Sequence, residues 1–303
     1  MRPYLDARRR NGFFSSADGK PLFYSVFTPE EPLATAVLVH GFTENIEKYS
    51  EVIWNYLRNG YRVCMYEQRG HGRSFHDDGR IHVTDIDDFG RYVDDLQCFL
   101  DGVVSRFPGP YVLHAHSMGG GVSALYLIRG SDFFSGAVLN SPMICPYTHR
   151  LPAAVCQGVF AVLRLFAPTR PMPLEGDYPG HEEFETSCTS SRVRFEFYEH
   201  EKRIVPYFQN WCASNRWAYL ALGIRKQLFS AGAPESVRVP VLLFSAGEDR
   251  VVQNSMQEAF VKRLPRGEFV TVPGVKHEIY LSPDETVHPY FDQLFAFLSE
   301  VTR

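Results

Sequence analysis

Short runs of apolar and often β-branched residues recur along the chain, and helix-like segments separate them. Runs of this kind are typical of strands that are buried on both faces of a parallel sheet. The expected strands are residues 36–39, 61–66, 111–113, 137–139, 241–244 and 269–272. The expected helices between them are residues 49–59, 87–106, 119–129 and 254–264. This alternation predicts an α/β protein with a mostly parallel sheet covered by helices on both faces.

Two parts of the chain depart from this alternation. Residues 12–29 hold Asp18-Gly19 between two aromatic-rich runs, which predicts an antiparallel hairpin leading into the sheet. From about residue 145 to 233 no strand is apparent, and stretches such as 191–202 are charged and helix-like. We therefore expect a core made of residues 1–145 and 234–303, interrupted by a helical cap at residues 146–233.

One segment of the expected cap is apolar nearly all round. Residues 151–167 include 13 apolar residues among 17, and the exceptions are Pro152, Gln157, Gly158 and Arg164. A helix with such a surface is either buried or in contact with lipid. Two interpretations stay open: a helix packed over the core, or part of a lid that also contacts acyl chains.

Composition and charge exclude several classes of protein. With 303 residues, 45% of them hydrophobic and 22% charged, the chain can build a large core, which excludes intrinsic disorder. The formal net charge of −4 lacks the basic excess of proteins that neutralise many phosphates, so no nucleic-acid partner is expected.

Targeting signals and cysteines indicate the compartment. No run reaches the roughly 18 apolar residues of a membrane span. The segment after Arg8-Arg9-Arg10 is too polar for a signal peptide. The six cysteines form no C-x-x-C pair and are expected to be reduced. We expect a cytoplasmic protein, with peripheral contact to the inner membrane as an alternative.

A serine stands where the expected strand at 111–113 runs towards a helix. Small residues two positions before and after Ser117, namely Ala115 and Gly119, let the backbone turn tightly and leave the serine oxygen exposed. The amide of Met118 then begins a helix and can point at a developing oxyanion. The pattern predicts Ser117 as a nucleophile, although small-x-Ser-x-Gly also arises by chance.

A second oxyanion donor is expected after the strand at 36–39. Gly41 permits close approach, and the amide of Phe42 would complete the oxyanion hole with that of Met118. A plain β-turn is the alternative. His40 is expected to support this loop rather than act as a base. Residues 70–74, Gly-His-Gly-Arg-Ser, are expected to form a turn with positive φ and receive no catalytic role.

The general base and its acid are sought near the C-terminus. His277 follows the last expected strand, which suits a chain order of serine, acid and histidine. The acid should follow the strand before it, where Asp249 is the first choice and Glu248 the nearest competitor. His288, with no strand before it, is expected at the surface.

A metal site is the alternative use of the histidines on the strand that precedes Ser117. His114 and His116 share one face of that strand at i, i+2 spacing, but no third ligand is apparent. We therefore expect no metal and no organic cofactor.

Five short segments, most of them at the ends of expected strands, carry a family resemblance. They are His40-Gly41-Phe42-Thr43-Glu44, Gly70-His71-Gly72-Arg73-Ser74, His116-Ser117-Met118-Gly119-Gly120, Glu248-Asp249-Arg250-Val251-Val252 and Gly274-Val275-Lys276-His277-Glu278. From about residue 12 onwards the chain resembles the α/β-hydrolases, and within them the bacterial lysophospholipase and monoacylglycerol lipase group. The family usually has Gly where this chain has Ala115.

The resemblance implies the α/β-hydrolase fold with a cap inserted after the sixth sheet strand. It also implies specific roles: Ser117 as nucleophile, Asp249 as acid, His277 as base, and the amides of Phe42 and Met118 as oxyanion hole.

The residues and the resemblance together predict a serine hydrolase of carboxylic esters, with lysophospholipids or monoacylglycerols as expected substrates and an acyl-enzyme on Ser117. An aminopeptidase, or a general carboxylesterase or thioesterase, would use the same triad. A dehalogenase or epoxide hydrolase would need Asp at position 117. A non-catalytic lipid-binding module is the alternative from another class. Peripheral membrane contact is expected through the cap, and the oligomeric state is not predicted.

Overall fold

The computed structural model describes residues 1–130, 132–149 and 151–303, and its centre is an eight-stranded sheet. In order across the sheet the strands are β1 (Arg9–Ser15), β2 (Pro21–Phe27), β4 (Tyr61–Tyr66), β3 (Ala34–Val39), β6 (Tyr111–His116), β7 (Gly136–Asn140), β9 (Val241–Ala246) and β10 (Gly267–Val272). Strand β2 runs antiparallel to both β1 and β4, and all other neighbours are parallel. The mostly parallel sheet, its six expected strands and the hairpin are confirmed.

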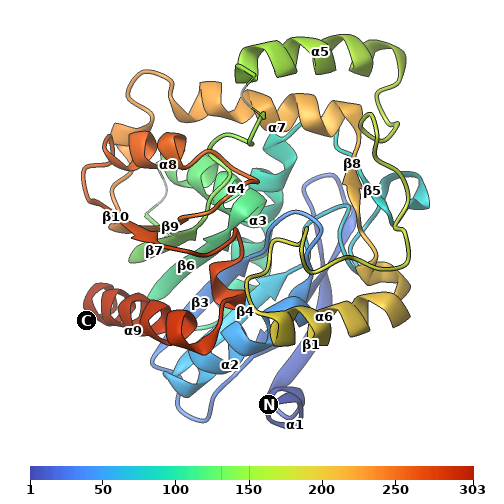
Figure 1. Ribbon diagram of the computed structural model, residues 1–303. Helices are drawn as coiled ribbons and strands as arrows, with labels where there is room; N and C mark the ends of the chain where they lie inside the picture. The colour runs from blue at the N-terminus through green and yellow to red at the C-terminus, as the bar shows by residue number, and fades with distance from the viewer. Residues whose placement is uncertain (131, 150) are drawn as a thin grey trace.

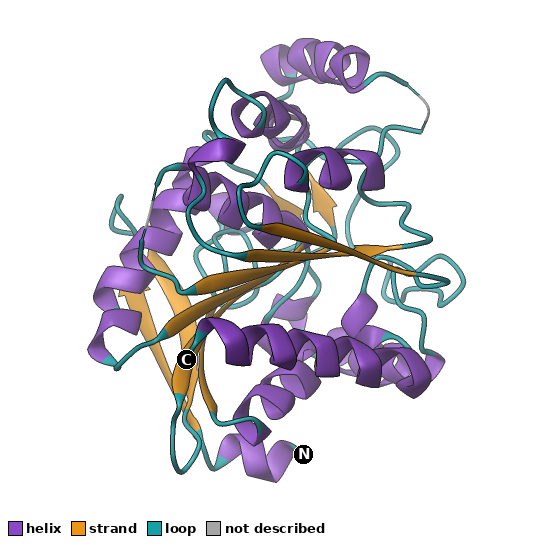
Figure 2. Ribbon diagram, turned by 90° about the vertical axis from the view of Figure 1, so that its left-hand side faces the viewer, coloured by secondary structure: helices purple, strands orange, loops and turns teal. Residues whose placement is uncertain are grey.

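Helices cover both faces of this sheet (Figures 1 and 2). The α-helices of the described residues are α1 (Arg2–Asp6), α2 (Ser50–Arg58), α3 (Gly90–Gly102), α4 (Ser117–Ile128), α5 (Ala153–Phe166), α6 (Arg192–Ile204), α7 (Asn215–Leu228), α8 (Asn254–Val261) and α9 (Asp284–Val301). Short 3-10 turns are η1 (Ile46–Tyr49), η2 (Asp77–Gly79), η3 (Val104–Arg106), η4 (Pro206–Phe208), η5 (Pro234–Ser236) and η6 (Ile279–Leu281).

The central strands are buried because both of their faces are covered. Successive side chains of a strand point to opposite faces. Val37 and Val39 accordingly join the apolar cluster beneath α3, α4, α7 and α8, whereas Ala36 and Leu38 join the cluster beneath α2 and α9. The near-continuous apolar runs of the sequence therefore reflect a sheet buried between two layers of helices.

Three helices lie between β7 and β9, where a cap was expected. Helix α7 packs into the core, and α5 rests on α7 as the outermost helix at the top of Figure 1. One detail of the expectation is wrong, because a two-residue strand, β8 (Cys212–Ala213), pairs with β5 (Val83–Thr84). Two residues are too few to leave a strand pattern in the sequence.

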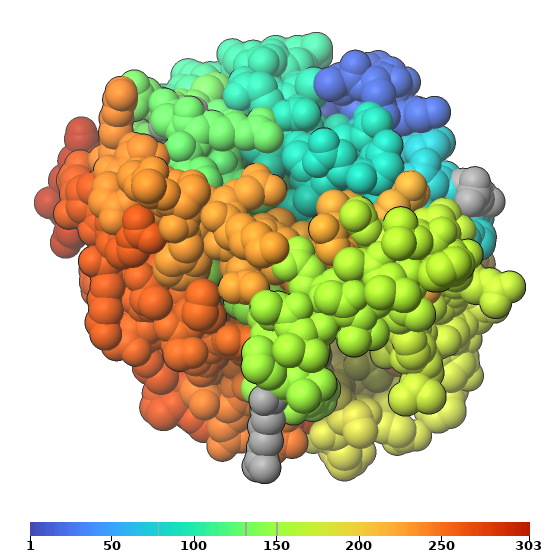
Figure 3. Space-filling view, turned by 90° about the horizontal axis from the view of Figure 1, so that it is seen from above, coloured from blue at the N-terminus to red at the C-terminus, as the bar shows by residue number. Residues whose placement is uncertain are grey.

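The apolar helix α5 is not buried over the core, so the first of its two interpretations is wrong. The only residue of α5 that is buried is the polar Gln157, while Phe166 is 85% and Leu165 is 72% exposed. The reason is geometric, since α5 packs on α7 along one side and its outer side faces away from the molecule (Figure 3). Among the described residues, no helix is long and apolar enough to cross a membrane.

Candidate active site

Ser117 lies at a sharp bend between the end of β6 and the first turn of α4. Its φ is +50°, a left-handed conformation that is uncommon for a residue with a side chain and costs of order 1–3 kcal/mol. Gly119 makes the bend possible, because a methyl group there would lie 2.4 Å from the carbonyl oxygens of Val39 and His40. The turn thus places α4 directly against the end of β3.

This close approach predicts a large stability effect at Gly119. Gly119→Ala should lower the free energy of unfolding by about 3 kcal/mol, because backbone carbonyls cannot move aside as a side chain can. Gly158→Ala in the middle of α5 is the matched control. An added methyl group there meets nothing within 4 Å, so it should raise stability by about 0.5–1 kcal/mol. Thermal and urea unfolding measure both, and equal effects of the two changes would contradict the close packing at the bend.

The structure brings Ser117, His277 and Asp249 together in one hydrogen-bonded chain. The Nε2 atom of His277 lies 2.7 Å from Oγ of Ser117, and its Nδ1 atom lies 2.7 Å from Oδ2 of Asp249. The competitor Glu248 is exposed. Three loops at the ends of β6, β9 and β10 therefore bring a serine, a histidine and an aspartate together in the geometry of a triad.

Backbone amides hold the acid in place. The second oxygen of Asp249, Oδ1, accepts hydrogen bonds from the amides of Val251 at 2.8 Å and Val252 at 3.1 Å. Burial alone would raise the pKa of Asp249, but His277 and these two amides favour the charged form and leave the pKa below its ordinary value. Asp249 is thus a fixed carboxylate that can orient His277.

The two expected oxyanion donors flank Ser117. The amide of Met118 is the second in α4 and has no acceptor within its own helix. The amide of Phe42 donates to no other atom of the described chain. The Phe42 ring packs against Trp217 at 4.4 Å and against His71 at 5.7 Å, which fixes the loop after β3.

The carboxylate of Glu44 joins the loop after β3 to the loop that carries His277. Its Oε2 accepts from the amide of Gly41 at 2.6 Å and from Tyr49 at 2.7 Å. Its Oε1 accepts from Tyr280 at 2.5 Å and pairs with Lys48 at 3.2 Å. Burial alone would raise the pKa of Glu44, but Lys48, the nearby His116 and the tyrosine hydroxyls hold it well below its ordinary value.

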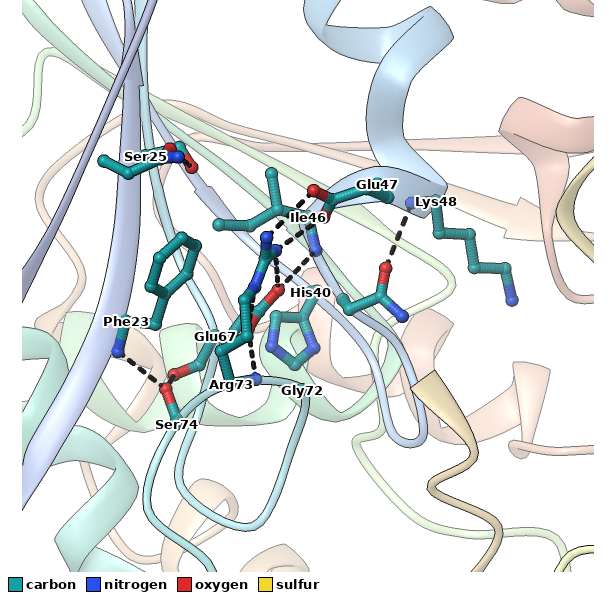
Figure 4. Close-up of polar contacts among 12 residues, drawn as sticks. Phe23, Ser25, His40, Ile46, Glu47, Lys48, Glu67, Gly72, Arg73 and Ser74 are labelled. Carbon is teal, nitrogen blue, oxygen red and sulfur yellow. Dashed lines mark hydrogen bonds and ion pairs between the residues drawn. The ribbon is translucent and has the colours of Figure 1, made fainter. Parts of the chain in front are cut away.

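Arg73, from the segment 70–74, also stabilises the loop after β3. Figure 4 shows it between the carboxylates of Glu47 and Glu67, with the His40 ring close by. Glu67 also accepts from the amide of Ile46 at 3.3 Å. Gly70 and Gly72 have φ of +75° and +54°, so the expected turn with positive φ is confirmed. The segment thus supports the loop that holds Phe42.

Three further histidines, His40, His114 and His116, each contact different residues. His40 accepts from the amide of Gln68 at 2.9 Å, as expected of a residue that supports its loop. His114 is held by Tyr56 at 3.0 Å and Tyr290 at 3.4 Å. The centre of the His116 ring lies 4.8 Å from that of His277, with the rings tilted by 48°, and burial lowers the pKa of His116 to about 4.

A partly open cavity of about 160 Å³ lies over Ser117 and His277. Its walls come from loops at the ends of the sheet strands and from residues 182–202, and none of its lining residues belongs to α5. The core contributes Lys48 and Glu278, whose Nζ and Oε1 atoms are 2.5 Å apart. Sequence reasoning missed Glu44, Lys48 and Glu278. Glu44 and Glu278 lie two positions and one position from the predicted site residues Phe42 and His277, but this spacing does not indicate that they are buried or paired.

Comparison with known proteins identifies the family of this chain. The family model described as serine aminopeptidase, S33, matches residues 30–284. The chain is 26% identical to lysophospholipase L2 of Escherichia coli (strain K12), with 94% of this chain and 86% of that protein covered. It is 25% identical to a monoacylglycerol lipase of Mycolicibacterium smegmatis, with 93% and 94% covered.

Solved structures share the fold. A soluble variant of monoglyceride lipase from Saccharomyces cerevisiae, in complex with a substrate analogue, has a TM-score of 0.78 at 21% identity, with 96% of this chain and 95% of that chain covered. A carboxyl esterase from Bacillus coagulans has a TM-score of 0.77 at 18% identity, with 97% and 99% covered. The chain therefore has the α/β-hydrolase fold and belongs to the serine aminopeptidase S33 family of serine hydrolases.

Proposed function

We propose that this protein hydrolyses the carboxylic ester of a single-chain lipid, a monoacylglycerol or a lysophospholipid, through an acyl-enzyme on Ser117. The observation that carries this proposal is the continuous hydrogen-bonded chain from Ser117 through His277 to Asp249 beneath a cavity. The names of the relatives from Escherichia coli and Mycolicibacterium smegmatis support the lipid substrate.

In the first half of the reaction, Oγ of Ser117 attacks the ester carbonyl while its proton passes to Nε2 of His277. The amides of Phe42 and Met118 donate to the oxyanion, and Asp249 stabilises the imidazolium. Collapse of the tetrahedral intermediate breaks the bond to the alkoxide, which takes the proton from His277.

In the second half, water attacks the acyl-enzyme and gives one proton to His277. Collapse of the second intermediate returns that proton to Oγ of Ser117 and releases the fatty acid. These steps use no metal and no organic cofactor.

A substrate panel tests the proposal. It contains p-nitrophenyl esters of increasing chain length, monoolein, lysophosphatidylcholine and an aminoacyl p-nitroanilide. We expect ester hydrolysis with kcat/KM rising by up to about fourfold per added methylene, since each buried CH₂ contributes about 0.8 kcal/mol. Faster hydrolysis of the anilide would favour an aminopeptidase. No hydrolysis at all would favour a lipid-binding module.

We further propose that residues 146–233 form the cap and that the outer side of α5 meets a lipid surface. Four exposed apolar side chains, Val155, Val159, Val162 and Phe166, follow one another at helical spacing. The helix carries Arg164 as its only charged residue. An exposed apolar face on the outermost helix is the kind of surface that inserts into the boundary of a bilayer.

The proposed contact of α5 with lipid can be tested separately from any effect of α5 on the stability of the fold. Leu165→Ser with Phe166→Ser should change the free energy of unfolding by no more than about 0.5 kcal/mol, because both side chains are exposed. Vesicle binding and hydrolysis of vesicle-borne monoolein should fall about tenfold or more, whereas dissolved p-nitrophenyl acetate should be cleaved as before. Leu33→Ser, which changes a residue 73% exposed outside the cap, is the matched control. Equal loss on both substrates would contradict lipid contact.

A further inference from the structure

Lys202 is a buried cation that the proposed chemistry does not use. It lies on α6, is only 4% exposed, and lines the cavity that also holds Ser117. Its Nζ lies 5.1 Å from the ring of Tyr178 and 4.7 Å from that of Trp211, so the two rings hold it by cation–π contact.

The hydrogen bonds of Lys202 are incomplete. An ammonium group has three N–H donors. Within the described chain, Nζ donates one hydrogen bond, to Oε2 of Glu182 at a long 3.3 Å. Burial lowers the pKa of Lys202, although Glu182 and Glu199 oppose this. A buried ammonium is costly unless its charge and its donors are matched, so an acceptor bound in the cavity beside Nζ would stabilise it.

Lys48, the other lysine of the cavity, differs in this respect. It pairs with Glu278 at 2.5 Å and with Glu44 at 3.2 Å. Burial alone would lower the pKa of Lys48, but these two carboxylates raise it well above its ordinary value. Lys48 thus makes two ion pairs, whereas Lys202 makes one, with Glu182 at 3.3 Å, so Lys202 has more N–H donors left for a ligand.

Two carboxylates stand beside Lys202. Glu199 is 7% exposed, and its Oε1 accepts from Tyr178 at 3.1 Å and from the amide of Glu182 at 3.0 Å. In the described chain, no hydrogen bond reaches Oε2 of Glu199 or Oε1 of Glu182. The cap side of the cavity therefore offers free donors and free acceptors together.

The net charge of the residues that line the cavity favours some ligands over others. Four carboxylates and two lysines line the cavity, so a net anion would meet an excess of negative charge. A phosphate monoanion joined to an ammonium group carries no net charge. Its phosphate can accept from the free N–H donors of the wall, and its ammonium group can donate to the free carboxylate oxygens. Because one cavity of about 160 Å³ contains both Ser117 and Lys202, an alcohol released at Ser117 can reach Lys202 within it.

We propose that Lys202, Glu182 and Glu199 form the headgroup end of the leaving-group site, with Lys202 binding the phosphate of a zwitterionic lysophospholipid and the two carboxylates binding its ammonium group. This inference rests on the proposed function, and within it favours a lysophospholipid over a monoacylglycerol.

The test uses substrates that share one oleoyl chain and differ in headgroup. Lys202→Met keeps the length of the side chain and removes its charge. It should lower kcat/KM for lysophosphatidylethanolamine roughly 10- to 100-fold and leave monoolein within about twofold. Glu182→Gln should reduce the preference for lysophosphatidylethanolamine over lysophosphatidylglycerol. Lys262→Met, at a surface lysine paired with Glu258, is the matched control and should change neither substrate.

A second measurement needs no variant. Glycerophosphoethanolamine should inhibit the wild-type enzyme competitively, at concentrations at least tenfold below those needed for glycerol or inorganic phosphate. If inorganic phosphate inhibited as strongly as glycerophosphoethanolamine, the site would bind an anion without recognising the headgroup, and the proposal would be overturned. Equal loss on monoolein and lysophosphatidylethanolamine in Lys202→Met would overturn it too. If the wild type cleaves neither lipid, the proposed function itself is wrong.

Discussion

Ser117→Ala should lower kcat by about 10⁶-fold on every ester that the wild type cleaves, the loss typical of a serine protease without its nucleophile. The structure gives the reason, because Oγ of Ser117 is the atom 2.7 Å from Nε2 of His277. A fluorophosphonate probe should label the wild type on Ser117 and leave the variant unlabelled, as mass spectrometry can show.

Ser123→Ala is the matched control for this change. Ser123 is also buried on α4, and its Oγ has no hydrogen-bond partner in the described chain. Its replacement should leave both labelling and kcat unchanged. Full labelling of the Ser117→Ala variant would show that the nucleophile is another residue.

The sheet and the positions of the site residues could be predicted because they rest on local patterns. An apolar run such as 241–244 must be covered on both faces wherever it occurs, and β9 is buried throughout. Ser117, Asp249 and His277 each follow a strand of one parallel sheet, and the carboxyl ends of parallel strands meet at one edge. Pattern and topology together thus suffice to bring these residues close.

The charged supports of the site could not be predicted in the same way. Glu44, Lys48 and Arg73 occur in loops and turns, where charged residues are ordinarily solvated. Their burial depends on partners far away in the sequence, such as Glu278, which lies 230 residues from Lys48. A single sequence holds no local signal for such a pair.

Two helices of the proposed cap show the same limit of prediction. The helix-like stretch 191–202 is rich in charged residues, which are ordinarily exposed, yet Glu199 and Lys202 are buried against the cavity. Residues 151–167 are rich in apolar side chains, yet α5 is largely exposed. In both helices the pattern gives the element correctly, whereas its burial is decided by what packs against it.

Asp249→Asn should lower kcat by about 10⁴-fold, the loss known for the equivalent change in a serine protease. The amides of Val251 and Val252 donate to Oδ1 of Asp249. An asparagine would keep its carbonyl oxygen on these donors and turn its NH₂ group towards Nδ1 of His277. His277 would then carry its proton on Nε2, where it cannot accept the proton of Ser117.

The neighbouring residue provides the control, because Glu248 lies on the same loop with its side chain in solvent. Glu248→Gln should change kcat by less than about threefold, since an exposed charge is screened by water. Thermal melts of both variants would show whether either change alters the fold. A loss in Glu248→Gln that equals or exceeds the loss in Asp249→Asn would mean that the acid of the triad is Glu248, and that the 2.7 Å contact between Asp249 and His277 does not orient the base during turnover.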